Sequence, residues 1–264
     1  RLLRRNALPH LRKIIAKTHA ADLSRIFNSL SLTEQLKLFS MIEDIEQKGI
    51  LFSELEEDTL LSFVEALKIE EVVAIFEDMP TDDVADIIGK LPEETSDVIL
   101  RKMRTEGSEE IEGLLRYEDD TAGGIMVPDF IALREDVTAG EAIQSLQKEH
   151  QDVEMPFYLY VINEYGNLVG VSSLRQLVVV GPETPLKDFM VTDVFSVKTD
   201  MDQEEVAKIV ARYDILAVPV VDETNKLVGI VTVDDVIDIF RREAPEDILK
   251  MAGVVVDFVE TKYF

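Results

Sequence analysis

Two internal repeats of different length run through this 264-residue sequence, and they constrain its fold more than any other feature. In the shorter repeat, a Leu or Met recurs at a fixed spacing, and acidic residues follow each of these positions within four residues. The longer unit, of about sixty residues, occurs twice in the second half of the chain. Because the period of a repeat determines how its elements stack, the sequence predicts two domains of different architecture. The shorter repeat lies between about residues 22 and 116 and returns a Leu or Met every twelve residues, at Leu55, Leu67, Met79 and Leu91.

Each twelve-residue unit has the features of a helix start followed by an amphipathic helix. Pro80 and Pro92 are expected in first helical turns, where proline is tolerated, and Thr81 is expected to cap its helix. Apolar residues such as Val84 and Ile87 recur at helical spacing, and the nearby acids complement the helix dipole. Helices shorter than ~12 residues are marginal in water, so the units must stack on one another. The sequence therefore predicts an all-α, superhelical N-terminal domain.

The longer unit reads strand, helix, strand, hairpin turn, strand, helix in both copies. The stretch IMVPDFIAL parallels FMVTDVFSV, which places Met126 in register with Met190. Further along, YVINEYGNLVG parallels PVVDETNKLVG, which matches Gly170 with Gly229. Runs of β-branched residues bounded by Gly and Asn are typical of strands joined by tight turns. The second half is therefore predicted to contain two α/β units in tandem.

Hairpin turns are expected within the two matching loops, at residues 164–167 and 223–226. Tight turns between antiparallel strands need positive φ angles, which Gly and Asn adopt most readily. The residues that can supply them are Gly166, Asn167 and Asn225.

Charge excludes several classes of partner. The chain has 27 basic and 53 acidic residues, a net charge of −26, which repels nucleic acid and attracts cations or basic partners. The basic stretch RLLRRNALPHLRKIIAKTHAA at the start is the exception, and a solvated helix face explains it better than a membrane or partner role. No apolar run approaches the ~18 residues of a membrane helix. With no signal-peptide pattern and no cysteine, a cytoplasmic location is expected.

Two stretches of the sequence resemble those of known protein families. Residues 218–239, VPVVDETNKLVGIVTVDDVIDI, resemble the cystathionine-β-synthase (CBS) module, which occurs in tandem pairs that bind regulatory ligands. A helical superhelix joined to a CBS pair by RYEDDTAGGIM resembles the cytosolic part of the MgtE family of magnesium transporters. The implied fold is an all-α superhelical domain followed by a tandem α/β CBS pair.

The same resemblance implies domain limits and partners. It predicts a helical domain over 1–122, a first CBS domain over 123–186 and a second over 187–250. Residues 251–264 would start the segment that connects to the chain's own membrane domain, expected beyond Phe264. The expected assembly is a homodimer through the CBS domains, at the cytoplasmic face of the membrane, with no nucleic-acid partner.

Acidic pairs at helical spacing are the candidate metal ligands. Mg²⁺ prefers oxygen ligands and keeps several waters, so one or two carboxylates for each ion suffice. Asp82 and Asp86 share one helical face, as do Asp235 and Asp238. A solvated surface is the common explanation of any one such pair. The three histidines show no paired ligand spacing, so a zinc or copper site is not expected.

The MgtE resemblance raises these acids above that background. It implies that Mg²⁺ bridges acidic faces of the helical and CBS domains and favours a closed pore. Gly124 and Ala211 would contribute backbone carbonyls. Carried over residue by residue, the implied ligands are Asp82, Asp86, Gly124, Glu204, Ala211, Asp214, Asp235, Asp238, Glu243, Glu246 and Asp247.

One departure from the family pattern concerns an additional acidic ligand on an earlier helix of the N-terminal domain. An ungapped alignment places Ile50 at that position, so the site would lose a ligand. Glu46 or Glu54, one turn away on either side, is a candidate substitute.

Two alternative functions remain open. CBS pairs of other families hold adenine nucleotides such as ATP, with the Asp of a G-h-h-[ST]-x-x-D pattern on the ribose. Residues 229–235 complete this pattern with Asp235, whereas the first copy ends in Gln176. The helical repeats could instead form a protein-interaction scaffold. Catalysis is not expected, because no nucleophile–base pair, dinucleotide fingerprint or metal-hydrolase motif organises the carboxylates.

Overall fold

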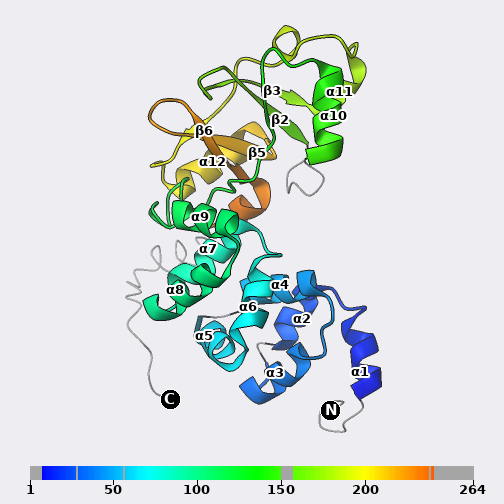
Figure 1. The fold of residues 1–264 in the computed structure, drawn as a ribbon, viewed down its shortest axis with the longest axis vertical. Coiled ribbons are helices and arrows are strands. Elements are labelled where there is room, and N and C mark those ends of the chain that lie inside the picture. Colours follow the sequence, from blue (N-terminus) through cyan, green and yellow to red (C-terminus); the bar gives the residue numbers. More distant parts are fainter. Residues whose placement is uncertain (1–7, 28, 56, 150–156, 238, 241–264) are drawn as a thin grey trace. The chain divides into compact units, whose positions relative to one another are not determined.

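The structure is a computed structural model that describes residues 8–27, 29–55, 57–149, 157–237 and 239–240 (Figure 1). The chain divides into a helical unit, Arg1–Leu115, and a unit that contains both CBS repeats, Arg116–Phe264. Within the described ranges, no helix is long and apolar enough to cross a bilayer.

The helical unit consists of short helices whose starts follow the twelve-residue repeat. Six successive helices, α4 to α9, begin at residues 45, 57, 69, 81, 93 and 105. The repeat thus extends to helices on both sides of the four predicted units. The helices are α1 (Leu8–Ile15), α2 (Ala20–Phe27), α3 (Leu32–Phe39), α4 (Ile45–Ser53), α5 (Glu57–Ala66), α6 (Ile69–Phe76), α7 (Thr81–Lys90), α8 (Glu93–Lys102) and α9 (Thr105–Leu114).

The predicted helix caps are wrong by one residue. Pro80 and Pro92 are N-cap residues with extended backbone, and their helices begin immediately after them. Thr81 is consequently the first helical residue rather than the cap. Proline fixes φ near −65°, a value shared by extended and helical backbone, so the sequence alone did not distinguish the two positions.

Packing between every second helix builds the superhelix. Contacts join α2 with α4, α4 with α6, and α6 with α8, and likewise α7 with α9. Phenylalanine rings meet edge to face, at 5.6 Å between the centroids of Phe39 on α3 and Phe52 on α4, and at 5.8 Å between those of Phe52 and Phe76 on α6. Such pairs add to the stability gained by burying the rings. The prediction that short helices stack on their neighbours is confirmed.

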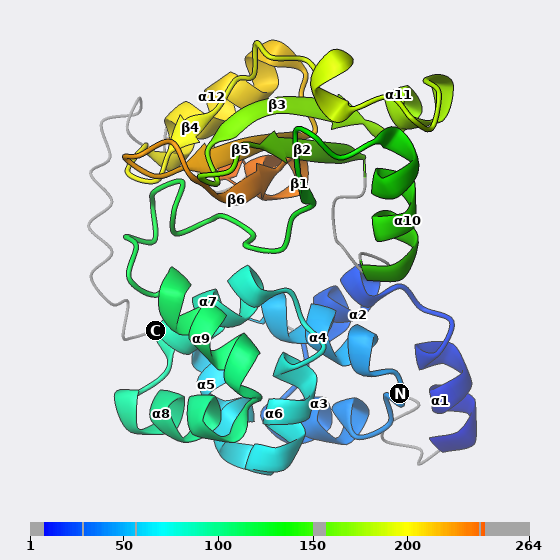
Figure 2. The same cartoon turned by 45° about the horizontal axis from the view of Figure 1, so that its top comes forward.

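The second unit holds two three-stranded sheets of the same plan (Figure 2). In each sheet the first strand pairs in parallel with the second, and the second pairs antiparallel with the third. A short closing helix follows the last strand of each repeat, α11 in the first and residues 233–237 in the second. The first repeat contains β1 (Ala132–Arg134), α10 (Ala139–Glu149), β2 (Tyr158–Ile162), β3 (Leu168–Ser173) and α11 (Leu174–Val179), and the second contains β4 (Val197–Lys198), α12 (Gln203–Tyr213), β5 (Ala217–Val221) and β6 (Leu227–Thr232).

The segment that precedes the first strand of each repeat pairs with the sheet of the other repeat. Val127 forms a bridge with Ile230, and Val191 forms the equivalent bridge with Val171. The two matched methionine–glycine pairs lie beside these bridges. A Cβ on Gly229 would lie 2.6 Å from the Met126 sulfur, and one on Gly170 would lie 2.5 Å from the Met190 sulfur. Both glycines are therefore required by close approach of the other repeat.

The two hairpin tips also pair with each other. Gly166 has a φ of 81° and Asn225 a φ of 65°, which confirms two of the three residues expected to adopt positive φ. Asn167 is not among the positive-φ residues of the described chain. The Leu168 amide donates to the Asn225 carbonyl, and the Leu227 amide donates to the Gly166 carbonyl. The repeats thus form one pseudo-symmetric module.

Candidate functional site

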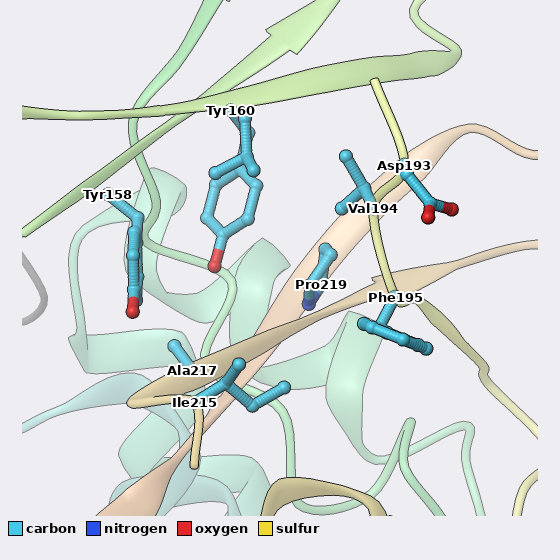
Figure 3. A pocket seen from close by; sticks show the side chains of 9 residues that line it. Tyr158, Tyr160, Asp193, Val194, Phe195, Ile215, Ala217 and Pro219 are labelled. Atoms are coloured by element: carbon cyan, nitrogen blue, oxygen red, sulfur yellow. The ribbon is translucent and has the colours of Figure 1, made fainter. Parts of the chain in front are cut away.

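A cavity of about 130 Å³ lies in the cleft between the two repeats (Figure 3). Tyr158 and Tyr160 of β2 form one side, and Ala217 and Pro219 of β5 form another. The remaining lining residues are Val171, Asp193, Val194, Phe195 and Ile215. The lining is thus mostly apolar with few polar groups, which is the usual make-up of a small-molecule site.

Tyr160 supplies the most unusual polar group of this cleft. Its side chain is only 2% exposed, and its hydroxyl has no hydrogen-bond partner among the described residues. Burial, and next the neighbouring Tyr158, raise the pKa of this hydroxyl, so it keeps its proton at neutral pH. Leaving a buried hydroxyl unsatisfied costs roughly 1–3 kcal/mol. Figure 3 shows this hydroxyl among the side chains that line the cavity, where a ligand can satisfy it.

The aromatic ring of Phe195 lines the cavity and packs against a residue outside the lining. Its ring stacks on the Tyr213 ring with 3.9 Å between centroids and 24° between planes. The Arg212 guanidinium lies 5.7 Å from the centroid of the same Tyr213 ring. This stack is a contact that supports the orientation of the Phe195 ring.

The closing turns decide where a ribose-binding carboxylate could lie. In the second repeat, Thr232 donates to the Asp235 carboxylate through its hydroxyl at 2.6 Å and its amide at 3.3 Å. In the first repeat, Gln176 accepts equivalent hydrogen bonds from Ser173, at 3.1 and 2.9 Å. Both side chains therefore have a structural role in starting the closing helix. The cavity described above borders β3, which leads into the turn with Gln176 and not the turn with Asp235.

Three predicted Mg²⁺ ligands lie on the helix α12 or at its end. Glu204 is in the first turn and pairs with Lys208 at 3.2 Å. Ala211 is in the last turn, where helix carbonyls have no partner within the helix. Asp214 caps α12 in the left-handed conformation, with a φ of 52°. All three thus expose oxygen atoms that suit a hard cation.

Asp82 and Asp86 lie on α7 of the helical unit, with Asp82 half-buried and Asp86 exposed. The neighbouring helix α4 approaches the start of α7, because the Ser53 hydroxyl donates to the Asp83 carboxylate at 3.0 Å. Ile50 lies one turn before Ser53 and is 39% exposed. The structure therefore places Ile50 on the helix that neighbours the predicted acids.

Glu46 and Glu54 are the two acids considered as substitutes for the carboxylate missing at Ile50. Both are exposed, at the start and at the C-cap of α4. Glu54 directly follows Ser53, the residue that contacts α7, and so it lies at the end of α4 that meets α7.

Gly124 lies in the turn that follows the helical unit. Its amide donates to the Thr121 carbonyl at 3.0 Å, and a Cβ at this position would collide with the Glu118 carbonyl. A Cβ at Gly123 would meet the Tyr117 ring. The glycine pair therefore permits a sharp turn.

Four predicted ligands, Asp238, Glu243, Glu246 and Asp247, lie outside the described residues, as do the end of the predicted second CBS domain, 241–250, and residues 251–264. Within the described ranges, no group of three or more His, Cys, Asp or Glu side chains is placed to hold a metal ion. The described candidates are carboxylate and carbonyl oxygens alone, a donor set that fits Mg²⁺ and not zinc.

The CBS resemblance implied a nucleotide in the cleft between the repeats, but the sequence did not identify the residues that line this cavity. Only the proline in the strand AVPVV hinted at it, because a proline in a strand marks a position where a neighbouring strand does not pair. The other lining residues come together from β2, β5 and the segment before β4, which no local pattern reveals.

The fold and the cleft define a regulatory protein in which a helical superhelix precedes a tandem CBS pair. The MgtE intracellular N domain model matches residues 18–120, and the CBS domain model matches residues 122–183 and 186–242. The chain belongs to the MgtE family of magnesium transporters and corresponds to the cytosolic region of that family. This region is regulatory and not enzymatic.

Relatives support the assignment over nearly the whole chain. The magnesium transporter MgtE of Bacillus subtilis (strain 168) is 36% identical over 254 residues, which cover 96% of this chain and 56% of that protein. The magnesium transporter MgtE of Thermus thermophilus is 50% identical over 145 residues, covering 55% of this chain and 32% of that protein. The chain thus spans between a third and just over half of these curated relatives.

Solved structures agree with the fold. The cytosolic domain of the Mg²⁺ channel MgtE in complex with ATP superposes with a TM-score of 0.82 at 35% identity, covering 86% of this chain and 93% of that chain. The soluble part of a magnesium transporter gives 0.79 at 31% identity, covering 92% and 95%. Both comparisons confirm the predicted order of an all-α domain and a CBS pair.

Proposed function

We propose that this chain is the Mg²⁺-sensing regulatory region of a magnesium transporter. The observation that carries the proposal is the excess of acids, 53 against 27 basic residues, in a chain of the MgtE family. Carboxylates at this density repel one another when no cation screens them. Mg²⁺ would bridge acidic faces of the helical and CBS units and favour a closed pore.

The ligands assigned to this role lie on helices of both units. Asp82 and Asp86 come from α7, and Glu204, Ala211 and Asp214 come from α12. Gly124 and Asp235 complete the described set, and the other four ligands that the family resemblance implies, Asp238, Glu243, Glu246 and Asp247, lie outside the described residues. Binding of Mg²⁺ shifts the equilibrium only by its higher affinity for the compact state, so several weak sites act together.

The transporter setting is part of the proposal. The relatives named magnesium transporter MgtE are longer than this chain, and their remaining length would hold the membrane domain. We place that domain after residue 264, and the regulatory region at the cytoplasmic face of the membrane. In this proposal the membrane domain forms the pore through which the transported ion passes.

The closing helices are the proposed homodimer surface. Val178 and Val179 of α11 are 76% and 77% exposed, and Ile237, which corresponds to Val178 in the second repeat, is also exposed. Equivalent apolar residues on both ends of a pseudo-symmetric module suit a second copy of the same chain. Changing Val178 and Val179 to Glu should convert a dimer to a monomer in sedimentation, whereas Val98→Glu on α8 should not.

Limited proteolysis during a Mg²⁺ titration tests the cation response. Asp82→Asn with Asp86→Asn should raise the Mg²⁺ midpoint for protection, because two shared ligands are lost. Glu93→Gln with Asp97→Asn removes the same charge from exposed sites on α8 and is the matched control. An equal midpoint in both double variants would remove Asp82 and Asp86 from the site.

Adenine-nucleotide binding is the second candidate function, and the cleft cavity favours it. A related cytosolic domain has been solved in complex with ATP, and the cavity here has the apolar walls and buried hydroxyl that suit a nucleobase. Nucleotide binding would then adjust the Mg²⁺ response. If ATP or adenosine changes proteolytic protection while Mg²⁺ does not, the nucleotide function replaces the cation function.

A further inference from the structure

We propose that the helical unit holds a further ligand site, a cavity between α6, α7 and α9 that binds a small alkylamine through its hydrocarbon chain and its ammonium group. This cavity, called the helical cavity below, has a volume of about 290 Å³. Its lining residues are all described and all belong to the helical unit. The inference goes beyond the proposed function and does not depend on it.

A break in the twelve-residue repeat leaves the helical cavity open. In the five helices before α9, the third residue carries a side chain, and it is Gln47, Thr59, Glu71, Asp83 or Thr95. Glu71 accepts a hydrogen bond from Lys48 of α4 at 2.7 Å, and Asp83 accepts one from Ser53 of α4 at 3.0 Å. In α9 the third residue is Gly107, which lines the cavity, and a Cβ there would meet no atom within 4 Å. The space that a side chain would occupy is therefore part of the cavity.

The floor of the helical cavity is apolar and suits a hydrocarbon chain. Phe76, Val84 and Ile111 line it and are each 1% exposed, and Met103 beside them is also buried. An apolar cavity of about 150 Å³ is large enough to hold benzene. The helical cavity is larger, so it can enclose a chain of several carbons. Each methylene group that moves from water onto such a floor strengthens binding.

A carboxylate is held in place at the rim of this floor. Glu77 is the C-cap residue of α6, and its Oε1 accepts a hydrogen bond from the Arg104 amide at 3.0 Å. Its Oε2 lies 3.8 Å from the Arg104 Nε, beyond hydrogen-bond distance. The Arg104 side chain is 86% exposed, whereas that of Glu77 is 26% exposed. An exposed ion pair contributes little stability, so a ligand ammonium can replace the Arg104 guanidinium beside this carboxylate.

The charge of the lining favours a cation over an anion. Glu77 and Glu110 are acidic, and Arg104 is the one basic residue among the described lining residues. The net charge of −26 adds to the attraction of a cation. An ammonium group donates charge-assisted hydrogen bonds to a carboxylate, which an alcohol of the same length cannot match. A primary alkylamine therefore suits both the floor and the rim.

Titration of the whole chain with hexylamine at physiological salt tests the proposal, with the methionine methyl groups labelled with ¹³C and assigned by Met→Leu variants. The methyl signals of Met79 and Met103, which line the cavity, should shift to saturation, and that of Met126, buried in the CBS unit, should not. Gly107→Leu should abolish the shifts, because its side chain enters the same space. Gly113→Leu, on the same helix and outside the lining, is the matched control and should retain them, since a Cβ there also meets no atom within 4 Å.

Affinities from the same titration test the recognition of charge. Hexylamine should bind more tightly than hexanol or hexanoate. Glu77→Gln should weaken hexylamine binding about 3- to 10-fold and leave hexanol binding unchanged. Glu93→Gln removes the same charge from an exposed site on α8 and should change neither affinity. An equal loss in Glu77→Gln and Glu93→Gln would overturn the role of Glu77. Shifts that persist in Gly107→Leu, or no saturable shift in the unmodified chain, would overturn the site itself.

Discussion

The two CBS repeats have the same order of strands and helices, but they differ at the residues that line the cavity. In the first repeat, Ile131 is buried and its carbonyl accepts a hydrogen bond from the Tyr160 amide at 2.8 Å. The corresponding residues of the second repeat are Phe195 and Pro219, and proline has no amide hydrogen to donate. Phe195 is exposed and lines the cavity. The position without a backbone hydrogen-bond donor, Pro219, is thus among the residues that line the cavity.

Side-chain volume follows the same difference. Phe130 of the first repeat packs edge-on against the Tyr160 ring, at 6.4 Å between centroids and 85° between planes. Its counterpart in the second repeat is Val194, a smaller side chain that lines the cavity. Replacing a ring by a valine at equivalent positions leaves space for a ligand.

The acids divide between the repeats as well. Glu204 on α12 corresponds to Gly140 on α10, where a Cβ would make a tight contact of 3.0 Å with the Pro182 carbonyl oxygen. Glu204, Ala211, Asp214 and Asp235, all proposed to bind Mg²⁺, belong to the second repeat. The two repeats therefore differ in their acids: these four proposed Mg²⁺ ligands lie in the second repeat, and the cavity borders the strand β3 of the first.

The largest effect should come from placing a phenylalanine at position 194, which corresponds to Phe130 of the first repeat. Val194→Phe should fill the cavity and weaken adenosine binding by at least about 10-fold, because the ligand and the new ring compete for one space. Calorimetric titration measures the affinity. Val191→Phe places the same substitution on an exposed residue outside the cavity lining and should leave binding unchanged. Unchanged binding by Val194→Phe would contradict the assignment of the ligand to this cleft.

The next effect concerns the feature that the repeats have in common. Gly170→Ala and Gly229→Ala should each destabilise the chain by roughly 1–3 kcal/mol, since the added methyl group meets a packed methionine. Urea unfolding measures both. Gly113→Ala in α9, where a Cβ meets nothing within 4 Å, should instead stabilise the chain. Markedly different losses at Gly170 and Gly229 would break the equivalence of the two contacts.

A smaller effect is expected at the hairpin tips. Gly166→Ala should cost roughly 1–2 kcal/mol, because a Cβ is strained at its φ of 81°. Asn225→Gly, at the equivalent position, should cost less, about 0.5 kcal/mol, because glycine accepts the same φ without strain and only the bond from the Asn225 side-chain amide to the Leu168 carbonyl, 3.3 Å long, is lost. Thermal unfolding compares the two variants with Gly181→Ala, where a Cβ makes an ordinary contact. A neutral Gly166→Ala would contradict the turn geometry.

The smallest effect is a difference in pH dependence between the two turns. Asp222 accepts hydrogen bonds from the amides of Lys226 and Thr224, which lower the pKa of its carboxyl group. Its stabilising contribution is therefore complete above its ordinary pKa of about 3.9 and is lost as pH falls through the lower value. Asn163 makes the equivalent bonds in the first repeat and does not titrate.

Urea unfolding between pH 7 and pH 2 checks this prediction. The stability difference between the unmodified chain and Asp222→Asn should shrink at acid pH, and Asn163→Asp should gain a similar pH dependence in the first turn. A difference that stays constant with pH would show that the carboxylate charge does not contribute to the turn.

Local signals predicted most of the elements. The recurring Leu or Met followed by acids placed the starts of α5 to α8, because side-chain spacing and helix-dipole preferences act within a few residues. The positive φ angles at Gly166 and Asn225 were predicted for the same local reason. The helix caps were not, since the φ of proline is compatible with both the extended backbone found at Pro80 and Pro92 and the first turn of a helix.

The cavity depends on residues that are distant in sequence. It requires Pro219 opposite Phe195, a valine at 194 and the stack of Phe195 on Tyr213. None of these pairings follows from periodicity. The role of Asp235 in starting the closing helix was equally hidden, because the motif that suggested a ribose ligand also forms a helix cap.

The central claim is that Mg²⁺ bridges acidic faces and favours a compact state. Small-angle X-ray scattering of the whole chain tests it most directly, with millimolar Mg²⁺ compared with NaCl at the same ionic strength. The account predicts a smaller radius of gyration in Mg²⁺ alone, and a weaker response in Asp82→Asn with Asp86→Asn. Identical scattering in Mg²⁺ and NaCl would contradict it.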